Sequence, residues 1–267
     1  MSRAGDQLRL DVLSMGFAAG SGHMGGSMSC AEIMSVLYDR ILRIDPQNPQ
    51  DRLRDRFILS KGHAAPMLYA CLARKGYIER SELASLRNID SPLQGHPSML
   101  KMPGIDMSTG SLGLGLSVGV GMALSLRGTD SRVYVLLGDG EMQEGQNWEA
   151  LMSVCSFNLA NITPIVDLNG VQLDGRTNEI QPNQTELTTK LKGFGFVVKE
   201  IDGHDEEMIE SALIWAQQVN KPHIIVANTV KGKGISFMEG QSAWHGKPLS
   251  EADYRLACEE IEGRLHQ

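Results

Sequence analysis

The stretch LLGDGEMQEGQNWEALMSVCSFNLANITPIVDLNGV, residues 136–171, decides the fold. It contains two apolar runs, one ending at Asp139 between two glycines and the other ending at Asn169. The segment between them has the apolar spacing of an amphipathic helix. A strand, a helix and a second strand in this order predict two neighbouring parallel strands whose carboxyl ends carry the two polar residues.

Similar runs recur along the chain, and five are predicted as short strands buried on both faces: 56–60, 132–139, 162–169, 195–202 and 223–230. Helical spacing fills the intervals between them. We therefore expect an α/β fold, a mostly parallel sheet with helices on both faces. Residues 1–267 are predicted as a single domain, with a C-terminal tail from about residue 240.

Two predicted helices each place apolar side chains on one face: Trp148, Leu151, Met152 and Cys155 in the first, and Met208, Ala212, Trp215 and Val219 in the second. A third predicted helix, within residues 112–126, is rich in glycine. Its Gly115 and Gly119 share a face and permit close approach of another backbone. That backbone belongs either to a partner protein or to the chain's own sheet.

Composition excludes several classes of function. The chain has 267 residues, 42% of them hydrophobic, and a formal net charge of −7. This charge argues against a nucleic-acid-binding surface. No apolar run has the length of a bilayer span, and the N-terminus lacks the features of a signal peptide. We expect no membrane association and a cytoplasmic protein.

Two long segments break the alternation of strands and helices. Residues 88–113 are rich in Gly, Pro and Ser, and residues 229–250 follow the last predicted strand and carry His245. Both are too long for ordinary connections. Loops of this size in an open α/β fold cover a site at the carboxyl ends of the strands.

Asp139 and Asn169 indicate what that site binds. A carboxylate, an amide and a backbone carbonyl are hard oxygen ligands of the kind that Mg²⁺ or Ca²⁺ takes beside a diphosphate. The glycines around Asp139 let backbone N–H groups approach such a ligand. Taken singly, each motif also has a structural explanation, because Gly-Asp-Gly is a common turn and Asn-Gly a common hairpin signal.

The combination resembles the thiamine-diphosphate signature, in which Gly-Asp-Gly is followed by an Asn after a helix and a strand. Three further segments, SGHMGGSMS (21–29), SKGHAAPMLYA (60–70) and GHPSMLKMPGIDMSTGSLGLGLSVGVGMA (95–123), resemble the N-terminal half of transketolases, in order and at plausible spacing. The resemblance runs from about residue 8 to His245. It implies the thiamine-diphosphate-binding fold and two-carbon transfer between sugars.

The resemblance also implies roles for particular residues. Those matched to the metal ligands, with the last acting through its carbonyl, are Asp139, Asn169 and Val171. Those matched to the cofactor contacts are His63, Gly110, Ser111, Leu112, Gly138, Gly140, Glu144 and His245. Ser111 replaces the family's proline, which removes some stiffness from that loop. Mg²⁺ is the implied metal, with Ca²⁺ or Mn²⁺ as alternatives. Glu144 also suits the first turn of a helix.

The four implied catalytic residues are His23, His63, His96 and His245. His23 and His96 match the histidines that reach the hydroxyls of the bound ketose. Imidazole titrates near neutral pH, so it suits the proton transfers of a reaction that breaks one C–C bond and forms another. Pentose phosphates are the family's default substrates.

The resemblance implies a partner as well. Transketolases continue through a pyrimidine-binding domain, which carries the glutamate that activates the cofactor and most of the basic residues that clamp sugar phosphates. This chain therefore resembles the N-terminal subunit of a split transketolase. It is expected to pair with a C-terminal subunit, with two copies of each in an α2β2 assembly.

Three alternatives remain open at this point. Deoxyxylulose-phosphate synthases share parts of the histidine segments, and the α-subunits of 2-oxoacid dehydrogenases carry Gly-Asp-Gly and Asn. The KGHA and QGHPS stretches favour transketolase over the dehydrogenase chains. The third alternative is a non-catalytic binding or regulatory homologue that keeps the fold.

Overall fold

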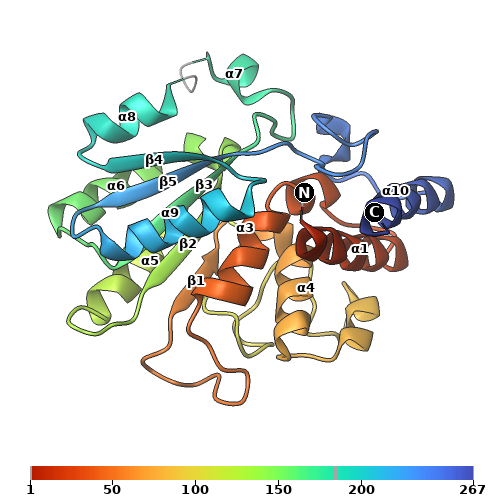
Figure 1. Ribbon diagram of the computed structural model, residues 1–267, viewed down its shortest axis with the longest axis horizontal. Coiled ribbons are helices and arrows are strands. Elements are labelled where there is room, and N and C mark those ends of the chain that lie inside the picture. The colour runs from red at the N-terminus through yellow and green to blue at the C-terminus, as the bar shows by residue number, and fades with distance from the viewer. Residues whose placement is uncertain (1, 183–185, 267) are drawn as a thin grey trace.

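A five-stranded sheet in the order β1-β2-β3-β5-β4 forms the centre of the computed structural model, which describes residues 2–182 and 186–266 (Figure 1). All neighbouring strands are parallel. The strands are β1 (Arg56–Leu59), β2 (Val133–Gly138), β3 (Ile162–Leu168), β4 (Val197–Asp202) and β5 (His223–Asn228). All five predicted strands are confirmed, so the carboxyl ends of β2 and β3 lie side by side as expected.

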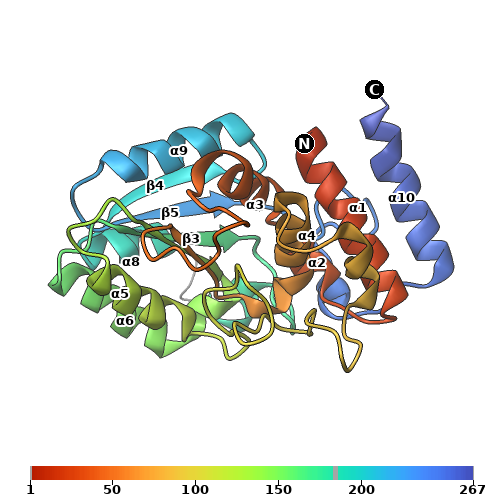
Figure 2. The same cartoon turned by 90° about the horizontal axis from the view of Figure 1, so that it is seen from below.

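Helices precede, connect and follow these strands. They are α1 (Arg3–Ala18), α2 (Met24–Met28), α3 (Ala31–Val36), α4 (Ala65–Lys75), α5 (Gly115–Ser125), α6 (Gly145–Ser156), α7 (Thr177–Ile180), α8 (Leu187–Gly193), α9 (Glu206–Gln218) and α10 (Glu251–Leu265). Figure 2 shows α9 on one face of the sheet and α5 and α6 on the other. The predicted α/β architecture with helices on both faces is confirmed. Among the described helices, none is long and apolar enough to cross a membrane.

The core has two layers, one on each side of the sheet, because alternate strand residues point to opposite faces. On β2, Tyr134 and Leu136 join the layer that contains α1, α3, α4 and α9. Val133 and Val135 join the layer under α5 and α6. Burying one such apolar side chain stabilises the fold by about 1.5–3 kcal/mol. The rigid sheet between the two layers fixes where the strands end.

Strand β4 is an exception to the expected burial. It lies at the edge of the sheet and pairs only with β5. Only Ile201 of this strand is buried, and Val197 keeps 40% of its surface exposed. The expectation that this strand is buried on both faces was wrong, because its run of apolar residues does not reveal that no strand lies beyond it.

The helical faces are rotated from the predicted ones. Helix α6 buries Ala150, Leu151 and Val154, whereas Met152 is 52% exposed. Helix α9 likewise buries Ile209, Ala212, Leu213 and Ala216, while Met208 points outward. Where apolar residues occupy adjacent positions, their spacing gives the period of a buried face but leaves its rotation undetermined.

The glycines of α5 face the chain's own sheet. A Cβ atom at Gly115 would lie 2.3 Å from Oγ of Ser60, and one at Gly119 would lie 2.8 Å from Cγ2 of Val135. A side chain at either position would push α5 away from β1 and β2. Intrachain packing therefore explains these two glycines, and the interface alternative is not needed for them.

A buried network of charges joins the termini to the rest of the fold. Arg9 of α1 is fully buried and donates to both oxygens of Glu32, each at 2.7 Å. The imidazole Nδ1 of His204 lies 3.0 Å from the same carboxylate. Asp6 contacts Arg9 and accepts hydrogen bonds from Arg264 of α10. These contacts hold α10 against α1, as Figure 2 shows.

Candidate active site

The predicted site residues gather at the carboxyl ends of β1, β2 and β3. A cavity of about 270 Å³ opens there, and much of its lining was predicted: His63, Leu112, Gly138, Asp139, Gly140, Glu144, Asn169, Val171 and His245. His23 and His96 lie beside this cavity, as the ring distances below show. Both long loops, 88–113 and 229–250, contribute to the site.

The turn after β3 holds the side chain of Asp139. Its Oδ2 accepts a hydrogen bond from the N–H of Gly170 at 2.7 Å, and its Oδ1 accepts one from the N–H of Gly140 at 2.9 Å. Asn169 Oδ1 accepts from the N–H of Val171 at 3.1 Å. Gly170 has φ +75°, a conformation that glycine adopts without strain. The turn thus places a carboxylate, an amide and a carbonyl close together.

No three His, Cys, Asp or Glu side chains of the described residues come together in a way that could hold a metal ion. A divalent cation at Asp139 would therefore need the oxygens of Asn169 and Val171, together with oxygens of a bound ligand. Such a mixed set of hard oxygens suits Mg²⁺, which keeps part of its coordination for phosphates and water.

A buried ion pair that the sequence did not reveal lies behind this turn. Lys61 contacts the carboxylate of Asp167 and donates to the carbonyl of Gly26 at 2.7 Å. Burial alone would lower the pKa of Lys61, but Asp167 outweighs it and the net shift is upward. Burial, followed by the charge of Asp167, raises the pKa of Asp139 to about 6. A cation near Asp139 would favour its ionised form.

Lys231 is a second residue that the sequence did not reveal. Its buried Nζ donates to the carbonyl oxygen of Val171 at 3.0 Å and lies 2.8 Å from Nδ1 of His245. Burial and the charge of Lys61 lower the pKa of Lys231 to about 8. It lines the cavity together with Lys61. Two lysines at its base make this cavity suited to an anionic ligand.

Four predicted histidines meet at the mouth of the cavity. The ring of His23 lies 5.6 Å from that of His63, 5.4 Å from that of His245 and 6.4 Å from that of His96. His63 and His245 stack at 5.0 Å. Segments distant in the sequence therefore supply one cluster of imidazoles.

The environment keeps these histidines neutral at pH 7. Burial, with smaller contributions from neighbouring cations, lowers the pKa of His23 to about 4 and that of His245 to about 3. Burial and the charge of Lys61 lower the pKa of His63 well below its usual value. Neutral imidazoles can both donate and accept hydrogen bonds. Nδ1 of His23 is buried without a hydrogen-bond partner in the described structure, so it is available to a bound molecule.

The loop 110–113 reaches the site through glycine. A Cβ atom at Gly110, where φ is +141°, would lie 3.0 Å from the ring of His96. Leu112 lines the cavity, whereas Ser111 is exposed. Glu141, which no sequence motif marked, fixes this loop: it accepts hydrogen bonds from Ser60 and from the N–H groups of Gly113 and Gly138. Glu144 begins α6 and is exposed at the rim, as an interface residue would be.

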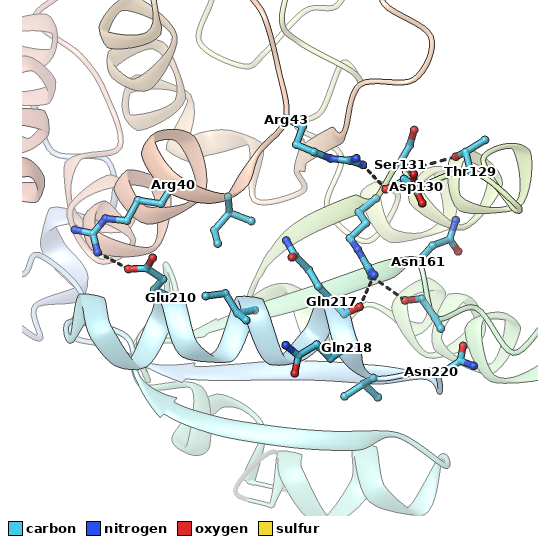
Figure 3. A pocket seen from close by; sticks show the side chains of 15 residues that line it. Arg40, Arg43, Thr129, Asp130, Ser131, Asn161, Glu210, Gln217, Gln218 and Asn220 are labelled. Carbon is cyan, nitrogen blue, oxygen red and sulfur yellow. Dashed lines mark hydrogen bonds and ion pairs between the residues drawn. The ribbon is translucent and has the colours of Figure 1, made fainter.

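A larger hollow lies at the opposite edge, near the amino ends of the strands. It measures about 670 Å³ and is lined by Arg40, Arg43 and Asp130, among others. In Figure 3, Arg40 pairs with Glu210, and Arg43 points toward Asp130. The Arg43 guanidinium also pairs with Asp55. These charges are already neutralised, and the glycines and histidines of the motifs lie elsewhere, so we assign the chemistry to the smaller cavity.

Comparison with known proteins agrees with this geometry. The family model described as "Transketolase, thiamine diphosphate binding domain" matches residues 2–262. A 6-deoxy-6-sulfo-D-fructose transketolase subunit from Clostridium sp. (strain MSTE9) is 44% identical, with 91% of this chain and 89% of the relative covered. One of the two subunits of an apulose-4-phosphate transketolase from Actinobacillus succinogenes is 41% identical, covering 95% of this chain and 92% of the relative.

Solved structures give the same result. A transketolase from Campylobacter jejuni matches with a TM-score of 0.90 and 33% identity. The match covers 98% of this chain but 43% of that protein, so the chain spans less than half the length of such transketolases. The whole-chain match of the family model and the subunit-length relatives lead to one conclusion: the chain belongs to the transketolase family and corresponds to its thiamine-diphosphate-binding domain.

Proposed function

We propose that this chain is the diphosphate-binding subunit of a two-subunit, thiamine-diphosphate-dependent transketolase of the cytoplasm. The observation that carries the proposal is the convergence of the Asp139 turn, Lys231 and the histidine cluster on one cavity. The enzyme would move a two-carbon ketol unit from a ketose to an aldose. Residues 1–267 would act as one diphosphate-binding domain, with the segment from about residue 240 as its tail.

The residues present fit the cofactor. Asp139, Asn169 and the carbonyl of Val171 would hold a divalent metal, for which Mg²⁺ is our first choice and Ca²⁺ or Mn²⁺ are alternatives. The N–H of Gly140 and the charge of Lys231 would face the diphosphate. A Cβ atom at Gly140 would lie 3.0 Å from Cβ of Gln172, so glycine leaves room there. When bound, thiamine diphosphate supplies the carbon that accepts and passes on the ketol unit.

The histidines would move the protons that ketol transfer requires. Because His23, His63 and His245 are neutral, each can accept a proton from a sugar hydroxyl or donate one to a developing oxyanion. The contact of Lys231 with Nδ1 of His245 favours the tautomer with the proton on Nε2, which gives His245 a donor. His96, at the outer end of the cluster, would contact the sugar hydroxyls.

The partner would be a C-terminal transketolase subunit that carries the pyrimidine-binding domain, assembled as α2β2. Supporting this, the relatives of similar length are named as subunits. The outer faces of α5 and α6 carry exposed apolar side chains beside the site, among them Leu114, Val118 and Met152. An apolar surface of this kind next to an active site suits a protein interface.

The substrates would be sugars with a tetrahedral anionic terminus. Two relatives are named for apulose 4-phosphate and for 6-deoxy-6-sulfo-D-fructose, which carry a phosphate and a sulfonate. The same class of substrate, with pentose phosphates as its common members, is proposed for this enzyme. We propose no binding of nucleic acid or membranes.

An assay of the reconstituted complex tests this function. The chain is co-purified with its partner, supplied with Mg²⁺ and thiamine diphosphate, and given ketose and aldose phosphates. Ketol transfer that needs both chains, metal and cofactor is expected. A complex that binds cofactor but transfers no ketol unit from any sugar would instead identify a non-catalytic homologue. Transfer by this chain without its partner would contradict the proposal of a split enzyme.

A further inference from the structure

Arg87 has an unusual backbone conformation close to the histidine cluster. Its φ is +64°, in the left-handed region that side chains other than Gly, Asn and Asp rarely adopt. The N–H of Arg87 donates to the carbonyl of Leu93 at 2.7 Å and closes a tight loop. Strained residues of this kind cluster at binding and catalytic sites because the surrounding structure compensates their cost of roughly 1–3 kcal/mol.

The strained backbone directs the guanidinium of Arg87 between two site segments. Its Nη1 donates to Oγ of Ser21 at 2.8 Å, two residues before His23. On the other side it lies against Gly95, where a Cβ atom would be 3.1 Å from Cζ, Nε and Nη2 of Arg87. Any side chain at position 95 would displace the guanidinium from its place beside His96. The charge therefore stands at the entrance between His23 and His96.

The positive charge of Arg87 is not neutralised. Within residues 2–182 and 186–266, Arg87 forms no ion pair, and its only side-chain hydrogen bond is the one to Ser21. The residue is exposed. Its charge is nevertheless felt at the site, because it contributes to lowering the pKa of both His23 and His96 after burial. A fixed guanidinium with unused donors presents a fork that matches a tetrahedral oxyanion.

We propose that Arg87 is a specificity-determining residue of this chain, which binds the phosphate or sulfonate terminus of a sugar entering between His23 and His96. This inference rests on the proposed transketolase function and adds a contact for the anionic group to the chain that also holds the cofactor's diphosphate. Phosphate and sulfonate share the tetrahedral, anionic oxygens that a guanidinium recognises.

Three variants separate charge, geometry and backbone. Arg87→Gly keeps the left-handed backbone without strain, Arg87→Gln removes the charge, and Arg87→Lys keeps a charge without the planar fork. Arg52→Gln is the control, because Arg52 is also exposed and has no side-chain partner in the described structure, but lies in the loop before β1 at the opposite edge. Each variant is tested in the complete complex with partner, Mg²⁺ and thiamine diphosphate.

Steady-state kinetics are measured with sugar phosphates, with sulfonated sugars and with the neutral pair erythrulose and glycolaldehyde. We expect Arg87→Gly and Arg87→Gln to raise KM for the anionic sugars by about tenfold to a hundredfold, the value of a charged hydrogen bond. Arg87→Lys should have a smaller effect. KM and kcat for the neutral pair, and the thermal stability of Arg87→Gly, should stay near wild type, as should all values for Arg52→Gln.

The remaining outcomes distinguish the possible failures. If the wild-type complex transfers no ketol unit between any sugars, the proposed function fails. If it does, but the Arg87 variants lose activity equally with neutral and anionic sugars, Arg87 only holds the two loops together and the inference is wrong. Variants that leave KM unchanged but bind the partner chain more weakly would show that Arg87 pairs with a carboxylate of that chain, which also contradicts the inference. A phosphate effect without a sulfonate effect would restrict the inference to phosphate.

Discussion

The Nζ atom of Lys231 lies 3.0 Å from the carbonyl oxygen of Val171 and so connects the candidate metal site to the histidine cluster. The same ammonium group lies 2.8 Å from Nδ1 of His245. One buried cation thus contacts both a proposed metal ligand and a proposed proton carrier. Its place at the base of the cavity makes it the principal candidate for a direct contact to the cofactor's diphosphate.

Replacing Lys231 by Met should weaken cofactor retention. A buried, charge-assisted hydrogen bond contributes about 1.5–3 kcal/mol, so the Kd of thiamine diphosphate should rise about tenfold to a hundredfold. Calorimetric titration of the complex with cofactor at saturating Mg²⁺ measures this change. Lys233→Met is the matched control, because Lys233 pairs with Glu239 outside the cavity. An unchanged Kd in Lys231→Met would remove the residue from the diphosphate site.

The neutral histidines predict a pH dependence of stability. The pKa of His23 is lowered to about 4 in the folded chain, whereas the unfolded chain titrates near the ordinary value of 6.5. Between these values the unfolded state binds more protons, so the free energy of unfolding contributed by this residue is fully present above pH 6.5 and falls as pH drops toward 4. Urea denaturation across this range compares wild type with His23→Gln.

The difference between the two proteins isolates the histidine, because other titrating groups act in both. His23→Gln should lose less stability than wild type on acidification. Parallel stability curves would show that His23 titrates alike in the folded and unfolded chain.

The buried network at the termini should be costly to break. Arg9→Met leaves Glu32 without its bidentate partner inside the protein, and removal of one member of such a pair costs about 3–5 kcal/mol. Thermal and urea unfolding measure the loss. Arg255→Met removes an exposed pair with Glu251 and should cost less than about 0.5 kcal/mol. Equal costs in the two variants would mean that the buried network does not stabilise the fold.

An acid on the outer face of α5 should block assembly. Val118 is 38% exposed there, and Val118→Asp would place a charge in the proposed interface. Sedimentation of the chain with its partner should show loss of the α2β2 species. Ile214→Asp on α9, where Ile214 is 42% exposed, is the control and should assemble normally. Normal assembly of Val118→Asp would place the partner on another surface.

Residues that carry a local motif could be found from the sequence. Asp139, Asn169 and the four histidines follow strands or lie in glycine-rich loops, so their flanking residues mark them, and the structure brings them together. Lys61, Lys231 and Glu141 could not be identified in this way. Their significance lies in partners far along the chain, Asp167, Val171 and Gly113 respectively, and single-sequence spacing does not encode such pairings.

The central claim is that Asp139 anchors a metal-bound thiamine diphosphate in a two-subunit enzyme. Native mass spectrometry of the α2β2 complex, prepared with Mg²⁺ and thiamine diphosphate, tests it most directly, with Asp139→Ala as the variant and Asp174→Ala, an exposed neighbour, as the control. Wild type and control should retain cofactor, and Asp139→Ala should assemble without it. An Asp139→Ala complex that retains cofactor as fully as wild type would contradict the account.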